Sequence, residues 1–336
     1  MSERGKYSLK KLLFVILTTV SLSLSLFSPG TKAAEGFSDV TKNHWANKEI
    51  AYISSLGIIN GFGDGTFRPN TNVTREHAAI IIGRALQIDI SNRPQPKFLD
   101  IKKNDQAYPY IAALTDEGVF ENVSFFNPSK YLTRAEMAKI LVNAFNLEGK
   151  SPNQFKDMPS AHWAYPYVST LVGRGITAGV SEGYYAPGDS VSRAQMVVFI
   201  ERTLMLNKEN DLLNEILRLT NVERSKIGVP LLKMSGEAEP VAMLKAKDLA
   251  ENAYFSHTSP TYGSPFDMLR DFGVSYSLAG ENLFAGSAEP SAAISSWMNS
   301  PGHRDNMLNP NFTHMGAGYA QGGPYRHYWV QIFITK

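Results

Sequence analysis

A sequence unit that occurs three times in succession constrains the fold more than any other feature of this chain. The copies begin at Phe37, Phe98 and Phe155, so equivalent positions are 61 and then 57 residues apart. Eight residues after these phenylalanines stand Trp45, Gln106 and Trp163. Repeats of this length indicate supersecondary units that bury their apolar faces against one another. We therefore expect the three copies to share one core.

Each copy predicts two helices. The first begins after an alanine and ends eleven residues later at a glycine, the residue that most readily takes positive φ at a helix end. These glycines are Gly57, Gly118 and Gly175. The second helix begins after a residue that caps helix N-termini, namely Thr74, Thr133 or Ser192. Glu136 and Gln195 complete capping boxes in copies two and three, and His77 stands at that position in copy one.

An arginine follows each capping residue, at Arg75, Arg134 and Arg193. Each therefore lies at the first position of a helix, where free backbone N–H groups and the macrodipole attract anions. A guanidinium adds a planar fork that matches a carboxylate. A single arginine at this position more often only solvates the helix end. Three equivalent arginines predict that the repeats bind a repeated acidic ligand.

The first copy, FSDVTKNHWANKEIAYISSLGIINGFGDGTFRPNTNVTREHAA, and its two relatives resemble the S-layer homology (SLH) module. The resemblance covers about residues 36–206. It implies a mostly α-helical, three-pronged bundle that attaches secreted proteins to the cell wall. The implied ligand is a secondary cell-wall polysaccharide that carries pyruvate ketals. The binding residues implied are Arg75, Arg134, Arg193, Trp45 and Trp163.

Copy two departs from the module's pattern. Gln106 replaces the aromatic residue, Asn122 replaces a turn glycine, and the turn is two residues shorter. We therefore expect Arg134 to contribute least to binding. The two tryptophans stack on sugar rings in one interpretation and belong to the core in the other.

Residues 211–336 have a different organisation. After a polar joint at residues 206–210, helical spacing of apolar residues ends at Gly228, and a second amphipathic helix covers roughly residues 240–252. The chain ends on HYWVQIFITK, whose alternating β-branched and aromatic residues predict a strand. Helices and strands without a βαβ rhythm predict an α+β fold.

Three residues of this part, His257, Glu281 and His303, could hold Zn²⁺ or another divalent ion. They are scattered over 47 residues without the spacing of a ligand motif. The alternative is a hydrogen-bonded polar cluster. Ser256 and Ser300 neighbour the histidines, but nothing in the sequence indicates an activated nucleophile, a P-loop or an H-E-x-x-H motif.

The segments NVERSKIGVPLL, FSHTSP, GEN and WMNSPGHR resemble a bacterial member of the CAP superfamily (cysteine-rich secretory proteins, antigen 5, pathogenesis-related proteins). The resemblance implies an α-β-α sandwich with a cleft of two histidines and two glutamates, which binds a divalent cation in some members. His257, Glu281 and His303 match three of the four positions. Ser300 stands at the second glutamate, so the set is incomplete. We therefore favour a CAP domain that binds a small ligand, a metal or a surface partner over an enzyme, with a hydrolase of wall polymer or peptide as the alternative.

The first 33 residues predict a secretory signal. Four basic residues precede an apolar run over residues 12–27, and small residues follow Pro29-Gly30. This run is short for a membrane span. The remainder is close to neutral, which argues against a nucleic-acid partner, and the chain has no cysteine. We expect a signal at 1–33, repeats at 36–95, 96–153 and 154–206, and the CAP domain at 211–336, in a secreted protein of the cell wall without stable membrane insertion.

Overall fold

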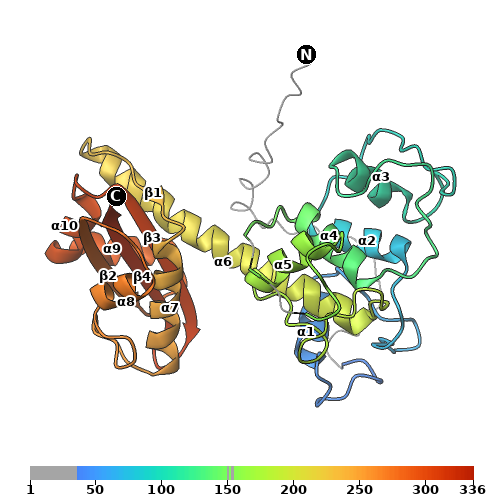
Figure 1. Ribbon diagram of the computed structural model, residues 1–336, viewed down its shortest axis with the longest axis horizontal. Helices are drawn as coiled ribbons and strands as arrows, with labels where there is room; N and C mark the ends of the chain where they lie inside the picture. Colours follow the sequence, from blue (N-terminus) through green and yellow to red (C-terminus); the bar gives the residue numbers. More distant parts are fainter. Residues whose placement is uncertain (1–35, 150, 153–154) are drawn as a thin grey trace, which may run out of the picture.

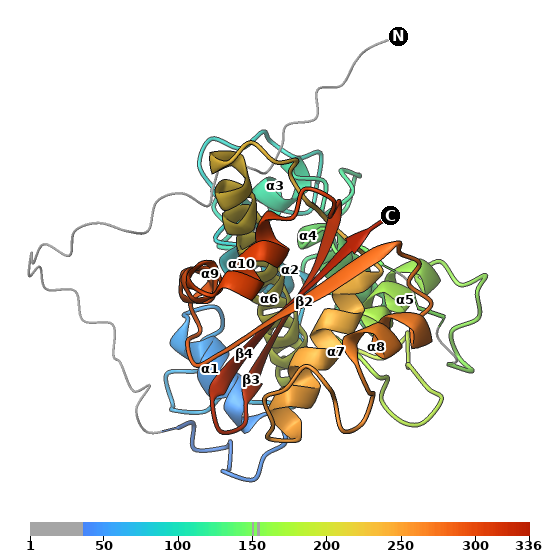
Figure 2. The same ribbon diagram turned by 90° about the vertical axis from the view of Figure 1, so that its left-hand side faces the viewer.

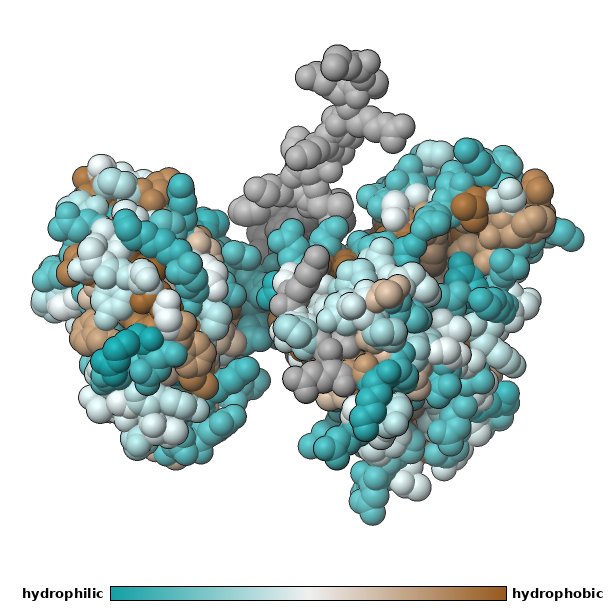
Figure 3. Space-filling model, viewed as in Figure 1, coloured by the Kyte–Doolittle hydropathy of each residue, from teal (hydrophilic) through white to brown (hydrophobic). Residues whose placement is uncertain are grey.

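The computed structural model describes residues 36–149, 151–152 and 155–336. They form two bodies joined by one long helix, and the space-filling view shows a narrow waist between them (Figures 1 and 3). The predicted secretory signal lies outside the described residues. None of the helices in the described part is long and apolar enough to cross a membrane.

The N-terminal body contains the three sequence repeats, each with two helices. Their bounds are α1 (Asn47–Ser55) and α2 (Arg75–Ala85), α3 (Tyr108–Asp116) and α4 (Arg134–Ala144), and α5 (Tyr165–Gly173) with the start of α6 (Arg193–Lys226). The capping boxes predicted at Thr133 and Ser192 are confirmed, and Thr74 caps α2. The predicted helix-ending glycines, Gly57, Gly118 and Gly175, all have φ near +70°.

A ring of backbone hydrogen bonds joins the three copies. Val73 N donates to Val191 O at 2.9 Å, Leu132 N to Val73 O at 2.9 Å, and Val191 N to Leu132 O at 2.8 Å. Each copy is thus bonded to both of the others. Buried apolar residues from all three copies also form one continuous cluster, as the repeat predicts. The three-pronged outline stays a prediction.

Helix α6 belongs to both bodies. Its early residues, including Val197 and Ile200, lie in the core of the repeats, whereas Leu213 and Ile216 lie in the core of the C-terminal body. The polar joint predicted at residues 206–210 is helical and does not interrupt α6. That stretch has no Gly or Pro and contains good helix formers such as lysine and glutamate, so nothing in it ends the helix.

The C-terminal body is a four-stranded sheet between two layers of helices (Figure 2). The strand order is β1-β3-β4-β2, with β1 parallel to β3 and the other pairs antiparallel. One apolar cluster lies between the sheet and α7 and α8, and another between the sheet and α6, α9 and α10. The bounds are β1 (Lys233–Met234), α7 (Ala238–Glu251), α8 (Pro265–Asp271), β2 (Leu278–Ala285), α9 (Pro290–Asn299), α10 (Pro301–Leu308), β3 (His314–Gly322) and β4 (Arg326–Thr335).

A buried arginine on α6 holds the loops at one end of this sheet. Arg224 is fully buried and its guanidinium donates to four backbone carbonyl oxygens. The acceptors are Pro230 and Asn309 at 2.7 and 2.9 Å, Met307 at 2.8 Å and Phe312 at 3.3 Å. One side chain therefore ties the end of α6 to the segment that follows α10.

Helix α7 packs so closely on β3 that a glycine is required where they cross. A Cβ at Gly318 would lie 2.1 Å from the carbonyl oxygen of Ala242. We expect Gly318→Ala to lower the free energy of unfolding of the C-terminal body by about 2–3 kcal/mol, because overpacking forces the backbone apart. Urea unfolding measures this change. Gly302→Ala is the matched control because its Cβ meets open space, and a loss as large as that of Gly318→Ala would contradict the packing explanation.

Candidate functional site

The three arginines at the helix starts lie at the junctions between copies. The Nε of Arg75 donates to Phe126 O at 2.7 Å, that of Arg134 to Tyr185 O at 2.7 Å, and that of Arg193 to Phe67 O at 2.8 Å. Each arginine therefore reaches into the next copy in cyclic order. Phe126, Tyr185 and Phe67 are equivalent positions of the repeat, so the three junctions have the same construction.

The expected free backbone N–H groups at the three helix starts are absent from the described residues, so that prediction is wrong. The backbone N–H groups at the start of these helices are not free, because carbonyl oxygens of the next copy accept them. Arg134 N donates to Asp189 O at 2.9 Å and Ala135 N donates to Pro187 O at 3.1 Å, and the other two copies do the same. An anion at these junctions must therefore be bound by the guanidinium groups rather than by the helix ends.

The junction at Arg134 contains a cavity of about 340 Å³, here called the Arg134 groove. All three copies line it, because Gly179 and Gln195 come from copy three and Trp45 from copy one. Arg202 also lines it, and the described lining residues include no carboxylate. Arg134 is 3% exposed, and its Nη2 finds no hydrogen-bond partner within the described residues. Burial lowers the pKa of Arg134.

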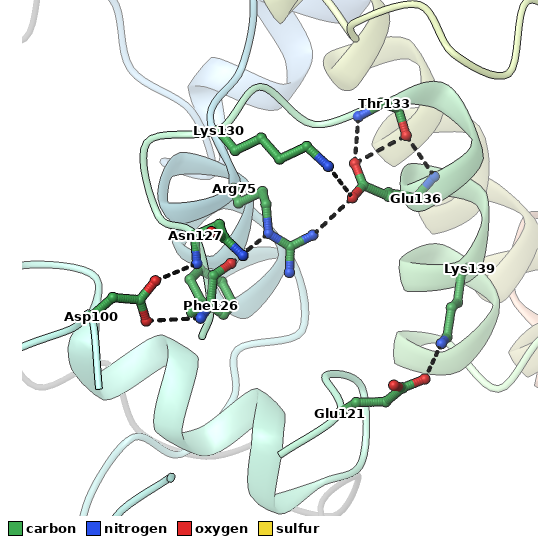
Figure 4. Close-up of polar contacts among 9 residues, drawn as sticks. All are labelled: Arg75, Asp100, Glu121, Phe126, Asn127, Lys130, Thr133, Glu136 and Lys139. Carbon is green, nitrogen blue, oxygen red and sulfur yellow. Dashed lines mark hydrogen bonds and ion pairs between the residues drawn. The ribbon is translucent and has the colours of Figure 1, made fainter. Parts of the chain in front are cut away.

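The junction at Arg75 contains a smaller cavity of about 260 Å³, here called the Arg75 groove, and Trp163 of copy three lines it. Its charges are already paired (Figure 4). Arg75 Nη1 lies 3.3 Å from Glu136 Oε1, Lys130 contacts the same carboxylate, and Lys139 pairs with Glu121. In the Arg134 groove the position of Glu136 is occupied by the neutral Gln195. An acidic ligand therefore meets a carboxylate in the Arg75 groove and none in the other.

Arg193 makes more contacts to the protein than its two equivalents. In addition to its Nε bond it donates from Nη2 to Asn60 O at 2.8 Å, and its guanidinium lies over the ring of Phe62. Burial lowers the pKa of Arg193 to about 10, so it stays charged at neutral pH. Trp45 and Trp163 belong to the junctions of Arg134 and Arg75. By the same cyclic order, the equivalent residue at the junction of Arg193 is Gln106 of copy two.

These junctions suggest a different ranking from the one based on copy two, and the contribution of each arginine to binding stays a prediction. On this cyclic order, the missing aromatic residue at Gln106 belongs to the junction of Arg193 and not to that of Arg134, because the arginine and the tryptophan of one junction come from different copies. The two tryptophans are not core residues, since Trp45 is 61% exposed and Trp163 is 52% exposed. Each lines a cavity that also contains an arginine.

In the C-terminal body, two of the three predicted cleft residues are in direct contact. Glu281 lies on β2, and its Oε1 is 2.6 Å from Nδ1 of His257 in the loop after α7. Burial raises the pKa of Glu281, and the hydrogen bond to Glu281 raises the pKa of His257. His303, on α10, is close enough for the charge of His257 to add to the effect of burial, which lowers the His303 pKa.

The contact between His257 and Glu281 differs from the geometry of three ligands around one ion. An imidazole that uses Nδ1 to bond a carboxylate presents Nε2 on the opposite edge of the ring. His257 and Glu281 therefore cannot both lie about 2 Å from one ion. Among the described residues, no group of three or more His, Cys, Asp or Glu side chains is arranged to hold a metal. Ser300 is the residue before α10 and makes no capping hydrogen bond with its side chain.

Sequence analysis missed a buried lysine beside this pair. Lys245 on α7 is fully buried, and its Nζ donates to Tyr254 Oη and to the carbonyl oxygen of His257, both at 2.9 Å. Burial lowers the pKa of Lys245, and the charges of Glu281 and Asp248 oppose that shift. Its spacing from Val241 and Leu249 puts it on the buried face of α7, which is the signal that could have revealed it.

Comparison with known families separates the two bodies in the same way. The model of the S-layer homology domain matches residues 36–79, 97–138 and 154–197, and the model of the cysteine-rich secretory protein family, CAP, matches residues 217–333. The chain combines three S-layer homology domains with a CAP domain. Copy two matches the S-layer homology model over residues 97–138 although Gln106 and Asn122 depart from the pattern.

The individual relatives match one part or the other. The CAP part is 48% identical over 122 residues to the uncharacterized protein YkwD of Bacillus subtilis, covering 36% of this chain and 46% of that protein. The S-layer homology part is 34% identical over 191 residues to the S-layer protein EA1 of Bacillus anthracis, covering 55% of this chain and 22% of that protein. The chain thus spans less than half of either relative.

Among solved structures, an extracellular SCP-domain protein of Bacillus anthracis is 41% identical to this chain. The match covers 40% of this chain and 43% of that one, with a TM-score of 0.36. The S-layer homology domains, together with S-layer proteins among the relatives, identify this chain as a protein associated with the cell surface.

Proposed function

We propose that this protein is secreted and held non-covalently on an acidic secondary cell-wall polysaccharide by its S-layer homology domains, with the Arg134 groove as the main binding site. The CAP domain then presents its cleft to a small ligand or to another surface molecule. The wall ligand carries carboxylates, as pyruvate ketals do.

The observation that carries this proposal is the buried guanidinium nitrogen Nη2 of Arg134, which lies beside a cavity and has no hydrogen-bond partner in the part of the chain that the structure describes. A buried donor without an acceptor lowers the stability of the folded state by about 1–3 kcal/mol, and a charged donor lowers it by more. A carboxylate in the groove would supply the acceptor and a charge-assisted hydrogen bond. Trp45 at the rim offers a flat apolar face for a sugar ring, and Arg202 adds a second positive charge.

Removal of the ketal pyruvate from purified cell wall should therefore abolish binding. We expect the affinity of the secreted chain to fall at least about tenfold, the effect of losing one charge-assisted hydrogen bond of about 1.5–3 kcal/mol. Sedimentation with intact and stripped wall measures the loss. Wall treated identically but without loss of pyruvate is the control. Equal binding to stripped and intact wall would exclude the carboxylate as the recognised group.

A hydrolase is the second candidate, and the contact between His257 and Glu281 favours it. A buried carboxylate that orients a half-exposed imidazole is the arrangement of a general base and its positioning partner. The site has Ser300 where the family has its second acid, so it lacks a matching acid at that position. We therefore prefer ligand binding. Incubation of the chain with wall polymer and peptides, followed by product analysis of wild type and His257→Ala, distinguishes the two.

A further inference from the structure

The buried lysine of the CAP domain lies where its charge acts on the cleft. Lys245 Nζ donates to Tyr254 Oη and to His257 O, and lies 4.9 Å from the centre of the Tyr254 ring. Tyr254 in turn donates to Asp248, which also accepts from Ser259 at 2.7 Å. Every contact of the ammonium is therefore to a group that is itself fixed. Lys245 is fully buried, so a ligand in solution cannot reach its ammonium group.

This ammonium is a fixed positive charge that is bonded to the backbone of His257, and its charge favours the ionised form of the buried carboxylate of Glu281. The side chain of Glu281 is 2% exposed, and its Oε2 finds no hydrogen-bond partner among the described residues. A buried carboxylate needs a nearby positive charge to stay ionised. Of the groups that favour the ionised form of Glu281, His257 acts through a hydrogen bond and Lys245 through its charge.

A divalent ion is the other candidate for the positive charge that keeps Glu281 ionised. The possible ligand atoms of His257, Glu281 and His303 do not suit such an ion. The bond between His257 Nδ1 and Glu281 Oε1 directs the remaining ring nitrogen away from the carboxylate. An ion on that side could gain at most the two imidazoles of His257 and His303, whereas protein sites with an open position use three ligands. An ion on the side of Oε2 would have one carboxylate oxygen as its ligand, and the charge of Lys245 already acts on that carboxylate.

We propose that Lys245 is the built-in cation of the cleft, that it positions the His257–Glu281 pair, and that this CAP domain needs no divalent metal. The lysine acts twice on the pair. It balances the charge of the carboxylate, and through the carbonyl of His257 it fixes the backbone that carries the imidazole. The inference is independent of wall binding, because it concerns only the C-terminal body.

Titration with zinc tests the first part. The unmutated, chelator-treated chain is titrated with ZnCl₂ at pH 7.5 in a calorimeter, and its thermal unfolding is followed with and without the metal. We expect no saturable heat and a shift of the CAP unfolding midpoint below about 1 °C at 100 μM Zn²⁺. Saturable uptake of one equivalent that disappears in His303→Ala or Glu281→Gln would overturn the proposal.

Substitution of the lysine tests the second part. Lys245→Met keeps the length of the side chain and removes its charge, and exposed Lys247→Met on the same helix is the matched control. Long-range ¹H–¹⁵N spectra report which nitrogen of His257 carries its proton and whether it is bonded. We expect Lys245→Met to shift these signals and Lys247→Met to leave them unchanged. Unchanged His257 signals in folded Lys245→Met would exclude a positioning role. If this variant does not fold, the same spectra of Lys245→Gln take its place, with the same two outcomes.

Discussion

Arg134→Ala is expected to weaken binding of the secreted chain to purified cell wall about 30- to 100-fold. This loss corresponds to about 2–3 kcal/mol, the contribution of a hydrogen bond to a charged group. Arg134 is the most buried of the three equivalent arginines, and the described lining of its groove contains no competing carboxylate. Sedimentation with increasing amounts of wall gives the affinity, and thermal unfolding shows whether the variant remains folded.

The Arg75 groove supplies matched controls. Arg75→Ala should cost less than Arg134→Ala, because Glu136 already pairs with that guanidinium. Glu136→Gln should strengthen wall binding, since it gives the Arg75 groove the neutral residue that Gln195 provides in the other. Glutamine also preserves the capping box. A larger loss for Arg75→Ala or Arg193→Ala than for Arg134→Ala would contradict the assignment of the main site.

Arg224→Met is expected to lower the free energy of unfolding of the CAP domain by about 4 kcal/mol. The substitution leaves four carbonyl oxygens without their donor inside the protein, and each buried unpaired group costs about 1–3 kcal/mol. Urea unfolding measures the change. Arg218→Met on the same helix is the control, because its exposed pair with Glu215 contributes at most about 0.5 kcal/mol. Equal losses for the two variants would contradict the role assigned to Arg224.

Features that depend on neighbouring residues could be predicted from the sequence. The caps at Thr133 and Ser192, the glycine that ends each first helix, and the arginine at each helix start are properties of a few adjacent positions. Their threefold recurrence made them unambiguous. The composition of the grooves could not be predicted in this way, because the partner of Arg134 is Trp45, which is 89 positions earlier in the chain. The ranking that placed Arg134 last treated each copy as a site of its own, whereas each groove combines residues from different copies.

The cleft shows the same limit. The contact of His257 with Glu281 follows from the family resemblance, but neither spacing nor composition shows that the histidine bonds the carboxylate through Nδ1. That geometry is the basis of our proposal that this domain needs no divalent metal. Lys245 was overlooked because a lysine on a helix is normally solvated, and only the packing of α7 on the sheet shows that this one is enclosed.

Because α6 is continuous between the two bodies, the number of residues between them sets the rotation of one body relative to the other about the helix axis. A helix advances about 1.5 Å and turns about 100° for each residue. One residue inserted at positions 206–210 would therefore rotate the whole CAP domain about the helix axis by about 100°, whereas it would barely lengthen the protein (Figure 1). Four inserted residues would bring it back to within about 40° of its original heading. The direction in which the CAP cleft faces, relative to the S-layer homology domains, therefore depends on the number of residues in this part of α6. Insertions there would rotate the cleft without changing any residue in it.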